Sequence, residues 1–429
     1  MSAIESNEQR TERHAHAGWK RTIALFLGGQ TISLFGSALV QYAMMWHLTL
    51  STNSGVMMTI YILCGFLPTF LLSPFAGVWA DRYNRKAIIV LADSTIAVAT
   101  LVLALLMLSG YDALWLFFLM AAIRALGTGV QGPAVGAVLP QIVPENMLTK
   151  MNGLYGSIQS LVTLLSPIVS AALLDVAPIE TIFFVDVATA AIAIFIMLTL
   201  VRIPIHAKAA LQQQIGFFAD MRQGLAYIRN HRFVMQLLSF FAIFFVLAAP
   251  VAFLTPLQVT RSFGTEYWRL TAIEIAFSIG MMLGGLLIAS WGGLRNRVHT
   301  LVLSGFLFGI FTFALGVVPS FWAYLAFMAI IGVAMPIFNT PSTVLLQEKV
   351  DNDYLGRVFG VLGMVSTSMM PLGMLVFGPI ADYVAIEWLL IGTGIGMFLL
   401  SIVILGNKSF VRAGEPADGA AAAGKPESD

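Results

Sequence analysis

The stretch GVWADRYNRK, Gly77–Lys86, places four formal charges in ten residues of a 429-residue chain in which only 10% of residues are charged. Long apolar segments lie on both sides of it, at about residues 55–80 and 87–109. Each segment has the 18 or more residues that a helix needs to cross a hydrocarbon core about 30 Å thick. The charged stretch is therefore predicted to be a short turn between two transmembrane helices.

The composition of the whole chain is that of a membrane protein. Apolar residues make up 58% of it and the mean hydropathy is +0.86, against roughly 45–50% apolar residues in soluble domains. The apolar segments lack the period-two alternation of β-barrel strands. A net charge of +1 argues against binding to nucleic acid, and the single cysteine, Cys64, excludes a disulfide framework or a cysteine-based metal site. The first twenty residues contain no apolar core of a signal peptide.

Twelve apolar segments predict an all-α integral membrane protein. They span approximately residues 22–49, 55–80, 87–109, 113–134, 149–174, 179–201, 233–256, 270–291, 298–318, 321–344, 356–381 and 388–407. The predicted domains are an N-terminal tail (1–21), a six-helix bundle (22–201), a linker (202–232), a second six-helix bundle (233–408) and a disordered tail (409–429).

Basic residues orient these segments. Of the 23 lysines and arginines, twenty fall on one predicted side, whereas only Arg261 and Arg269 fall on the other and Arg124 lies within a segment. The positive-inside rule then places both termini in the cytoplasm. In the linker, the sequence GFFADMRQGLAYIRNHR (216–232) has apolar residues at helical spacing. It predicts an amphipathic helix, either on the membrane surface or as a solvated linker.

The two halves of the chain carry an internal repeat. Residues 139–180 align without a gap on residues 346–387, at an offset of 207. The positions that are identical in both copies are Leu139, Val143, Leu148, Gly153, Gly156, Leu165, Val169, Asp175, Ile179 and Glu180. The alignment joins the fifth segment to the eleventh, which cross the membrane in the same direction. Two parallel six-helix repeats are typical of one large class of transporters.

The opening stretch resembles the charged signature after the second span of the major facilitator superfamily. Gly77, Asp81, Arg82, Arg85 and Lys86 match that signature, whereas Asn84 replaces its second glycine. The resemblance implies a cytoplasmic latch that stabilises the outward-open state and breaks when the carrier turns inward. The alternative is a run of basic residues that only anchors the topology. Asp93 lies two turns further on, where it could brace the latch arginines or handle protons.

Two further segments resemble elements of the same superfamily. AAIRALGTGVQG (121–132) places Arg124 near the membrane centre, where a guanidinium is costly unless it is paired or hydrated. The fifth segment has the spacing of the antiporter signature and keeps its first glycine and its proline. The matching positions considered for helix packing are Gly153, Ser166, Pro167 and Ser170. Ordinary packing of small residues is the alternative explanation.

Few acids lie within the predicted spans, and each is a candidate for proton or substrate handling. Asp186 could pair with Arg124 or line a cavity. Glu274 has apolar neighbours and is the sharpest candidate for reversible protonation, unless it forms a salt bridge with Arg269 or Arg261. Gln41 could hydrogen-bond a substrate, although a polar helix end would explain it equally well.

Three segments resemble the bacterial efflux branch that includes macrolide exporters and the enterobactin exporter. They are residues 133–154, the pattern that begins with Phe218 and Asp220, and residues 274–287. The resemblance implies a monomeric carrier in the bacterial inner membrane that exports amphipathic small molecules, such as drugs or macrolides, by proton antiport. No cofactor beyond the proton gradient is expected. A siderophore or metabolite exporter and an uptake facilitator remain alternatives, whereas an enzyme would need a catalytic cluster that the sequence does not suggest.

Overall fold

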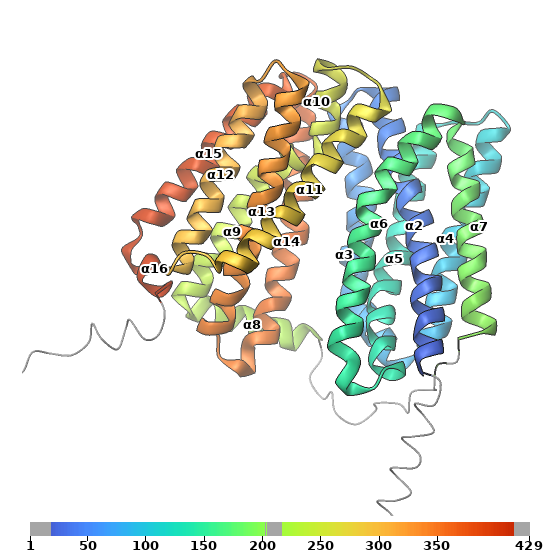
Figure 1. Ribbon diagram of the computed structural model, residues 1–429, viewed down its shortest axis with the longest axis horizontal. Helices are drawn as coiled ribbons and strands as arrows, with labels where there is room; N and C mark the ends of the chain where they lie inside the picture. The colour runs from blue at the N-terminus through green and yellow to red at the C-terminus, as the bar shows by residue number, and fades with distance from the viewer. Residues whose placement is uncertain (1–18, 202, 204–216, 416–429) are drawn as a thin grey trace, which may run out of the picture. The chain divides into compact units, whose positions relative to one another are not determined.

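The computed structural model describes residues 19–201, 203 and 217–415, and in these residues all regular structure is helical (Figure 1). Twelve helical segments of the described chain are long and apolar enough to cross a membrane. The predicted all-α membrane fold is therefore confirmed. The expected N-terminal tail up to residue 18, the linker at 202 and 204–216, and the tail from residue 416 lie outside the described residues.

The helices follow one another along the chain with short connections. Those of the N-terminal half are α2 (Trp19–Thr52), α3 (Gly55–Arg82), α4 (Arg85–Leu108), α5 (Leu114–Ile142), the 3₁₀ turn η1 (Glu145–Met147), α6 (Leu148–Val176) and α7 (Ile179–Thr199). Those of the C-terminal half are α8 (Phe217–Asn230), α9 (Arg232–Phe253), α10 (Thr255–Ser262), α11 (Tyr267–Trp291), α12 (Arg297–Val317), α13 (Phe321–Lys349), α14 (Asn352–Ile380), α15 (Ile386–Gly406) and α16 (Lys408–Ala413).

The chain forms two compact units. The first comprises residues 1–48 and 60–214, and the second comprises residues 49–59 and 215–429. The turn between α2 and α3 therefore groups with the C-terminal helices, although α2 and α3 otherwise belong to the first unit. The repeat is visible in helix lengths, because α5 and α13 both have 29 residues, α7 and α15 both have 21, and each pair begins 207 positions apart.

Several helix ends differ from the expected ones. Helix α5 continues to Ile142 through Pro133 and Pro140, beyond the end at about residue 134 that the apolar segment suggests. Membrane helices tolerate proline when neighbouring groups satisfy the freed carbonyls. At the other end of the chain, α16 begins at Lys408 and its Phe410 is buried against Phe233 at 4.9 Å. The first residues of the expected disordered tail, 409–413, are therefore helical, and an aromatic side chain anchors this turn.

The amphipathic segment of the linker is helix α8, which packs on the beginning of α14. The Tyr227 ring stacks on Tyr354 at 4.4 Å, and its hydroxyl donates to Asp351 at 3.1 Å. The pKa of Tyr227 is raised, mainly by burial and to a smaller extent by the neighbouring Asp351 carboxylate. Gly224 lies against Arg357, where an added Cβ would come within 3.1 Å of the arginine Cβ. These contacts attach α8 to the beginning of α14 in the second unit.

Glycines allow a close helix contact in the second unit, between α11 and α13. A Cβ at Gly280 would meet the Ala329 carbonyl oxygen, and a Cβ at Gly332 would meet that of Phe277. Small residues let membrane helices approach until their backbones touch. This pair of helices therefore depends on glycine in both partners.

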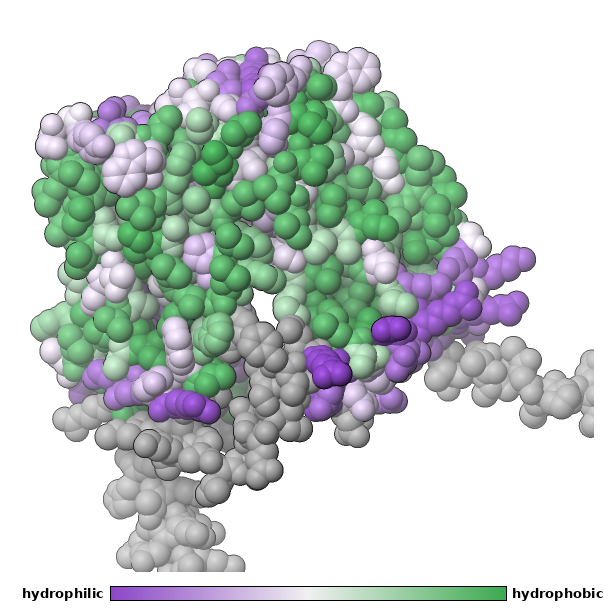
Figure 2. All heavy atoms as spheres, turned by 180° about the vertical axis from the view of Figure 1, so that it is seen from behind, coloured by the Kyte–Doolittle hydropathy of each residue, from purple (hydrophilic) through white to green (hydrophobic). Residues whose placement is uncertain are grey.

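Large apolar side chains cover the outward faces of the helices. Exposed examples are Leu91 at 69%, Leu286 at 68% and Val403 at 66%. Figure 2 shows hydrophobic residues along the middle of the helices and hydrophilic ones gathered towards their ends. Such a distribution is expected for a surface in contact with lipid.

Candidate functional site

Three helices of the first unit bring its intramembrane charges together. Helix α4 packs against both α5 and α7, so that Asp93 of α4, Arg124 of α5 and Asp186 of α7 all lie in the interior. Each of these helices is otherwise free of charge along the middle of its length. The charged groups therefore gather in one place, away from the lipid-facing side chains.

Arg124 and Asp186 form a buried ion pair. The Arg124 Nη1 atom lies 2.8 Å from Asp186 Oδ2, and the two side chains are 11% and 1% exposed. The structure thus brings together two residues for which the sequence offered pairing as one of two alternatives. A buried pair of this kind is stable only when its remaining hydrogen-bonding groups are also satisfied.

Neutral groups from two more positions complete the ion pair. Thr100 accepts a hydrogen bond from Arg124 Nη1 at 3.2 Å and donates one to Asp186 at 3.2 Å. Ser37 donates to the other carboxylate oxygen at 3.3 Å, and its carbonyl accepts from Arg124 Nη2 at 2.8 Å. Contacts from α2, α4, α5 and α7 therefore surround both partners of the ion pair.

Asp93 makes a separate set of contacts. Its Oδ1 atom accepts hydrogen bonds from Ser33 Oγ at 3.1 Å and from Gln131 Nε2 at 2.7 Å, and the residue is 5% exposed. Both donors are neutral and come from α2 and α5. The sequence suggested that Asp93 braces the latch arginines, whereas the contacts shown for it lie deeper in the bundle.

Two basic residues of the opening stretch bind backbone carbonyls within the first unit. Arg85 is buried and donates to the carbonyls of Ala80 at 2.8 Å and Ala137 at 2.7 Å. Lys86 donates to Leu198 at 3.1 Å and to Val201 at 2.9 Å, where α7 ends. Cations are favourable at such helix ends because they neutralise unsatisfied carbonyls.

The other latch residues are less constrained in the described structure. Arg82 is exposed, Gly77 is half-buried with no atom within 4 Å of a would-be Cβ, and the side chain of Asp81 is outside what the structure describes. Asn84 caps α4 by accepting a hydrogen bond from the Ala87 amide at 3.4 Å. The latch function thus remains a prediction of the resemblance.

Glu274 of α11 has no hydrogen bond or ion pair to another residue in the described part of the chain, and it is half-buried. The two arginines considered as its partners are engaged elsewhere: Arg269 pairs with Glu266 at 2.8 Å, and Arg261 pairs with Asp382 at 3.4 Å. The bond to Arg269 holds the pKa of Glu266 below its usual value. Glu274 is therefore an acid within a membrane helix without a countercharge among the described residues.

The remaining candidates separate into packed and exposed positions. Ser166, Pro167 and Ser170 of α6 are buried, and Ser170 donates to the Leu39 carbonyl of α2 at 3.2 Å. Gly153 is exposed and has open space around it. Gln41 is exposed, and its carbonyl accepts a hydrogen bond from Tyr61 at 3.4 Å. The later part of the antiporter-like pattern, from Ser166 to Ser170, is therefore buried in helix packing, whereas its first glycine is not.

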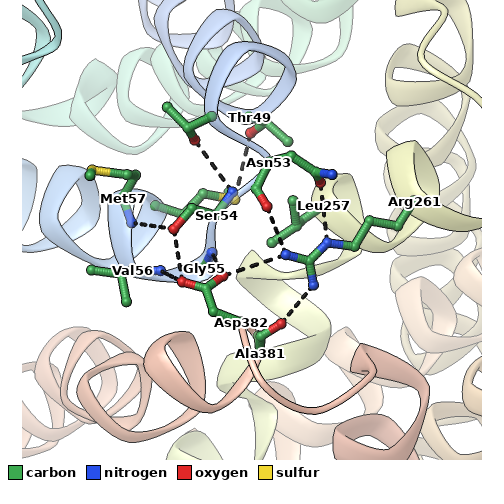
Figure 3. A network of polar contacts seen from close by, with 12 residues as sticks. Thr49, Asn53, Ser54, Gly55, Val56, Met57, Leu257, Arg261, Ala381 and Asp382 are labelled. Atoms are coloured by element: carbon green, nitrogen blue, oxygen red, sulfur yellow. Dashed lines mark hydrogen bonds and ion pairs between the residues drawn. The ribbon is translucent and has the colours of Figure 1, made fainter.

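Asp382, which the sequence left without a role, caps the first turn of α3 (Figure 3). Its carboxylate accepts from the Gly55 amide at 2.6 Å, the Ser54 hydroxyl at 2.8 Å and the Val56 amide at 3.1 Å. Burial alone would raise the pKa of Asp382, but these hydrogen bonds and the charge of Arg261 hold it below its usual value. A carboxylate at a helix N-terminus also interacts favourably with the helix dipole.

Arg261 completes this cluster from the end of α10. It donates to Asn53 Oδ1 at 3.1 Å, to the Asn53 carbonyl at 2.7 Å and to the Ala381 carbonyl at 2.6 Å. Asn53 adopts a left-handed backbone conformation with φ of 47°, which asparagine tolerates better than most residues. Asp382 matches Asp175 of the first repeat at the offset of 207, and this match could have drawn attention to the position. It does not predict that Asp382 binds the first turn of α3 and Arg261.

The described residues contain no group of three or more histidine, cysteine or acidic side chains that could hold a metal ion. The chemistry that the charges of the first unit support is that of a buried ion pair beside a separate buried acid. Such groups inside a membrane are typical of pathways for ions and substrates.

The major facilitator superfamily model matches residues 22–374, and the chain belongs to this family of membrane transporters. It is 33% identical over 390 residues to macrolide efflux protein A of Streptococcus pyogenes, covering 90% of this chain and 95% of that protein. It is 34% identical over 314 residues to macrolide efflux protein A of Enterococcus faecalis, covering 73% and 97%. A more distant relative is the staphyloferrin A transporter of Staphylococcus aureus, 22% identical with 83% and 89% covered.

Solved structures show the same fold at low sequence identity. The nucleoside transporter NupG has a TM-score of 0.69 at 15% identity, covering 90% of this chain and 98% of that one. A bacterial homologue of the iron transporter ferroportin has a TM-score of 0.68 at 16% identity, covering 89% and 98%. The family and these relatives are transporters, not enzymes.

Proposed function

We propose that this transporter exports amphipathic small molecules of the macrolide class from bacterial cells by proton antiport with alternating access. The observation that carries the substrate class is the 33% identity to macrolide efflux protein A over 90% of this chain. The 20-to-2 bias of basic residues favours a cell-membrane location with both termini in the cytoplasm. The carrier acts as a monomer and uses no cofactor.

The proposed energy source for transport is an ion gradient. The sequence has no phosphate-binding loop of a nucleotide-driven pump, so that an ion gradient is the natural source. One proton moving down 100 mV releases about 2.3 kcal/mol, which supports roughly a fifty-fold gradient of a neutral solute at 1.4 kcal/mol per decade. A single exchanged proton is thus sufficient for useful efflux.

The charges inside the membrane supply groups for this coupling. Arg124 and Asp186 lie 2.8 Å apart, so that a change in one alters the electrostatic environment of the other. Glu274 lies in the second unit without a visible countercharge among the described residues. We assign proton exchange to Glu274 and control of the local field to the ion pair.

Transport in everted membrane vesicles tests this function. Radiolabelled erythromycin should accumulate in energised vesicles that contain the wild-type protein, and an uncoupler that collapses the proton gradient should abolish the accumulation. Glu274→Gln should reduce it at least tenfold, whereas Glu415→Gln, which changes an exposed acid near the chain end, should not. Accumulation that persists after the gradient has collapsed would exclude proton coupling.

A siderophore exporter is the second candidate, because the staphyloferrin A transporter is 22% identical over most of both chains. A strain that lacks the transporter would distinguish the two. Increased sensitivity to macrolides supports the first candidate, whereas retention of a siderophore with unchanged macrolide sensitivity supports the second.

A further inference from the structure

We propose that Asp93, together with Ser33 and Gln131, forms a proton-binding site in the first unit that is distinct from the Arg124–Asp186 ion pair. The proposal rests on the proposed proton antiport and adds a second proton-binding group, in the N-terminal half, to Glu274 of the second unit. The site is built from three helices, since Ser33 belongs to α2, Asp93 to α4 and Gln131 to α5.

The contacts of the two buried aspartates differ in kind. Asp186 faces the guanidinium of Arg124 at 2.8 Å and accepts from two hydroxyls besides. Asp93 is also buried, at 5% exposed, but its hydrogen bonds come from a hydroxyl and an amide. The ion pairs between described residues do not include it. An acid buried without a countercharge favours its neutral, protonated form far more than one that is paired.

The geometry leaves room for the proton. Both hydrogen bonds shown for Asp93 end on Oδ1, which leaves Oδ2 as the atom that carries the hydrogen in the neutral acid. When the O–H bond breaks, the proton passes to water and the charge left on the carboxylate is stabilised by the same two donors. Ser33 and Gln131 are both buried, with 4% and 8% exposed, and so remain in place in either state.

The fold does not require an acid here, as the second repeat shows. Asp93 lies nine residues after the N-cap Asn84 of α4, and the residue nine positions after the equivalent N-cap Asn296 of α12 is Gly305. At the offset of 207 that relates α5 to α13, Gln131 corresponds to Phe338, which is 1% exposed. A buried acid and its amide donor are thus replaced by a glycine and a phenylalanine in a bundle of the same topology.

Other titratable groups on the packed helices are accounted for. On α4 itself, Arg85 and Lys86 lie about two turns away and bind backbone carbonyls. The charged residue of α5 is Arg124, which is paired with Asp186 of α7. Of the remaining titratable residues of α7 and α2, Glu180, Lys20, Arg21 and His47 lie near the helix ends. Tyr42 packs its ring against Trp46 at 5.5 Å. Among the described residues of this unit, Asp93 is thus a buried acid that takes part in no ion pair.

Reconstituted transport tests the site. Purified full-length protein in liposomes is assayed with radiolabelled erythromycin, once for exchange across the membrane without a pH difference and once for accumulation driven by a pH difference. We expect Asp93→Asn to retain exchange within about twofold of the wild type and to lose at least 90% of the pH-driven accumulation. Asp175→Asn, an exposed acid at the end of α6, should behave as the wild type in both assays.

The outcomes separate this site from the proposed function. If the pH difference drives accumulation by the wild type and equally by Asp93→Asn, the site is wrong while proton antiport stands. If the pH difference has no effect on accumulation by the wild type, proton antiport is wrong, and the proposal that Asp93 binds the exchanged proton is wrong with it.

A second variant covers the case in which Asp93→Asn does not fold. Gln131→Leu keeps the acid but removes the donor at 2.7 Å, so the charged carboxylate is less stable and half-maximal pH-driven transport should move to a pH higher by at least half a unit. An unchanged midpoint in folded Gln131→Leu protein overturns the proposal.

Discussion

The buried ion pair of the first unit can be tested by replacing one partner and then both. Arg124 and Asp186 are 11% and 1% exposed and 2.8 Å apart. At a separation of about 4 Å between charge centres and an effective dielectric constant of 20, their attraction is about 4 kcal/mol. Removal of either partner leaves the other charge buried and alone, for which the typical cost is about 3–5 kcal/mol. We therefore expect Arg124→Met and Asp186→Thr each to lose most of this amount.

The double variant should recover much of the loss. Replacing both members of a buried pair by neutral residues of similar size is often neutral in stability. The second repeat supports this choice of residues, since the positions equivalent to Arg124 and Asp186, at the offset of 207, are Ile331 and Thr393, both buried. We expect Arg124→Met combined with Asp186→Thr to lie within about 1–2 kcal/mol of the wild type, and still to be inactive in pH-driven transport.

Thermal unfolding of the purified proteins in detergent measures these differences. For a unit of about 200 residues, 3–5 kcal/mol corresponds to a decrease in Tm of about 10 °C. Each single variant should show this decrease and the double variant should regain at least half of it. Asp175→Asn provides the control, because Asp175 is exposed. Single variants as stable as the wild type, or a double variant that loses the sum of both, would refute the reasoning.

Three further predictions follow from other contacts. Gly332→Val drives a side chain into the α11 backbone and should lower stability by about 1–3 kcal/mol or more, whereas Gly285→Ala, in open space, should leave the Tm nearly unchanged. Asp382→Ala should lower the free energy of unfolding by about 0.5–2 kcal/mol. Because the folded-state pKa of Asp382 is lowered, this contribution is present above about pH 4 and is lost as the pH falls through the folded-state pKa. The Tm difference from the wild type should therefore vanish at low pH. Asp81→Asn should insert into the membrane normally but slow transport if the latch operates, and transport at the wild-type rate would leave only topological anchoring.

The overall architecture could be predicted because it depends on properties that are local in sequence. The length of each apolar segment defines a membrane-spanning helix, and the offset of 207 between the repeats required only matching residues. Arg124 could also be identified, since a lone guanidinium in an apolar segment demands a partner. Asp186 was one of few acids available to it, so the pair could be named as a possibility but not decided.

The partners of the other charged residues could not be predicted. Arg85 and Lys86 bind backbone carbonyls at the ends of helices, and every residue carries such a carbonyl, so the sequence gives no preference among them. Asp93 is hydrogen-bonded by residues 60 positions before it and 38 positions after it. These meet only because α2, α4 and α5 face one another with a particular rotation, which a helical pattern of low amphipathicity does not determine.

The two repeats have diverged in the chemistry of their interiors. In the first unit, buried positions carry Arg124, Asp186 and Asp93, whereas the second unit has an isoleucine, a threonine and a glycine at the equivalent places. Its interior contains instead a cluster of aromatic rings, in which Phe244 stacks on Phe338 at 4.4 Å. Since α5 and α13 have the same length, as do α7 and α15, with either set of residues, packing alone does not explain why charges are buried in one half. The cost of burying them is justified if the first unit binds and releases the coupling ion, which is what the variants of Asp93 and of the ion pair are designed to separate.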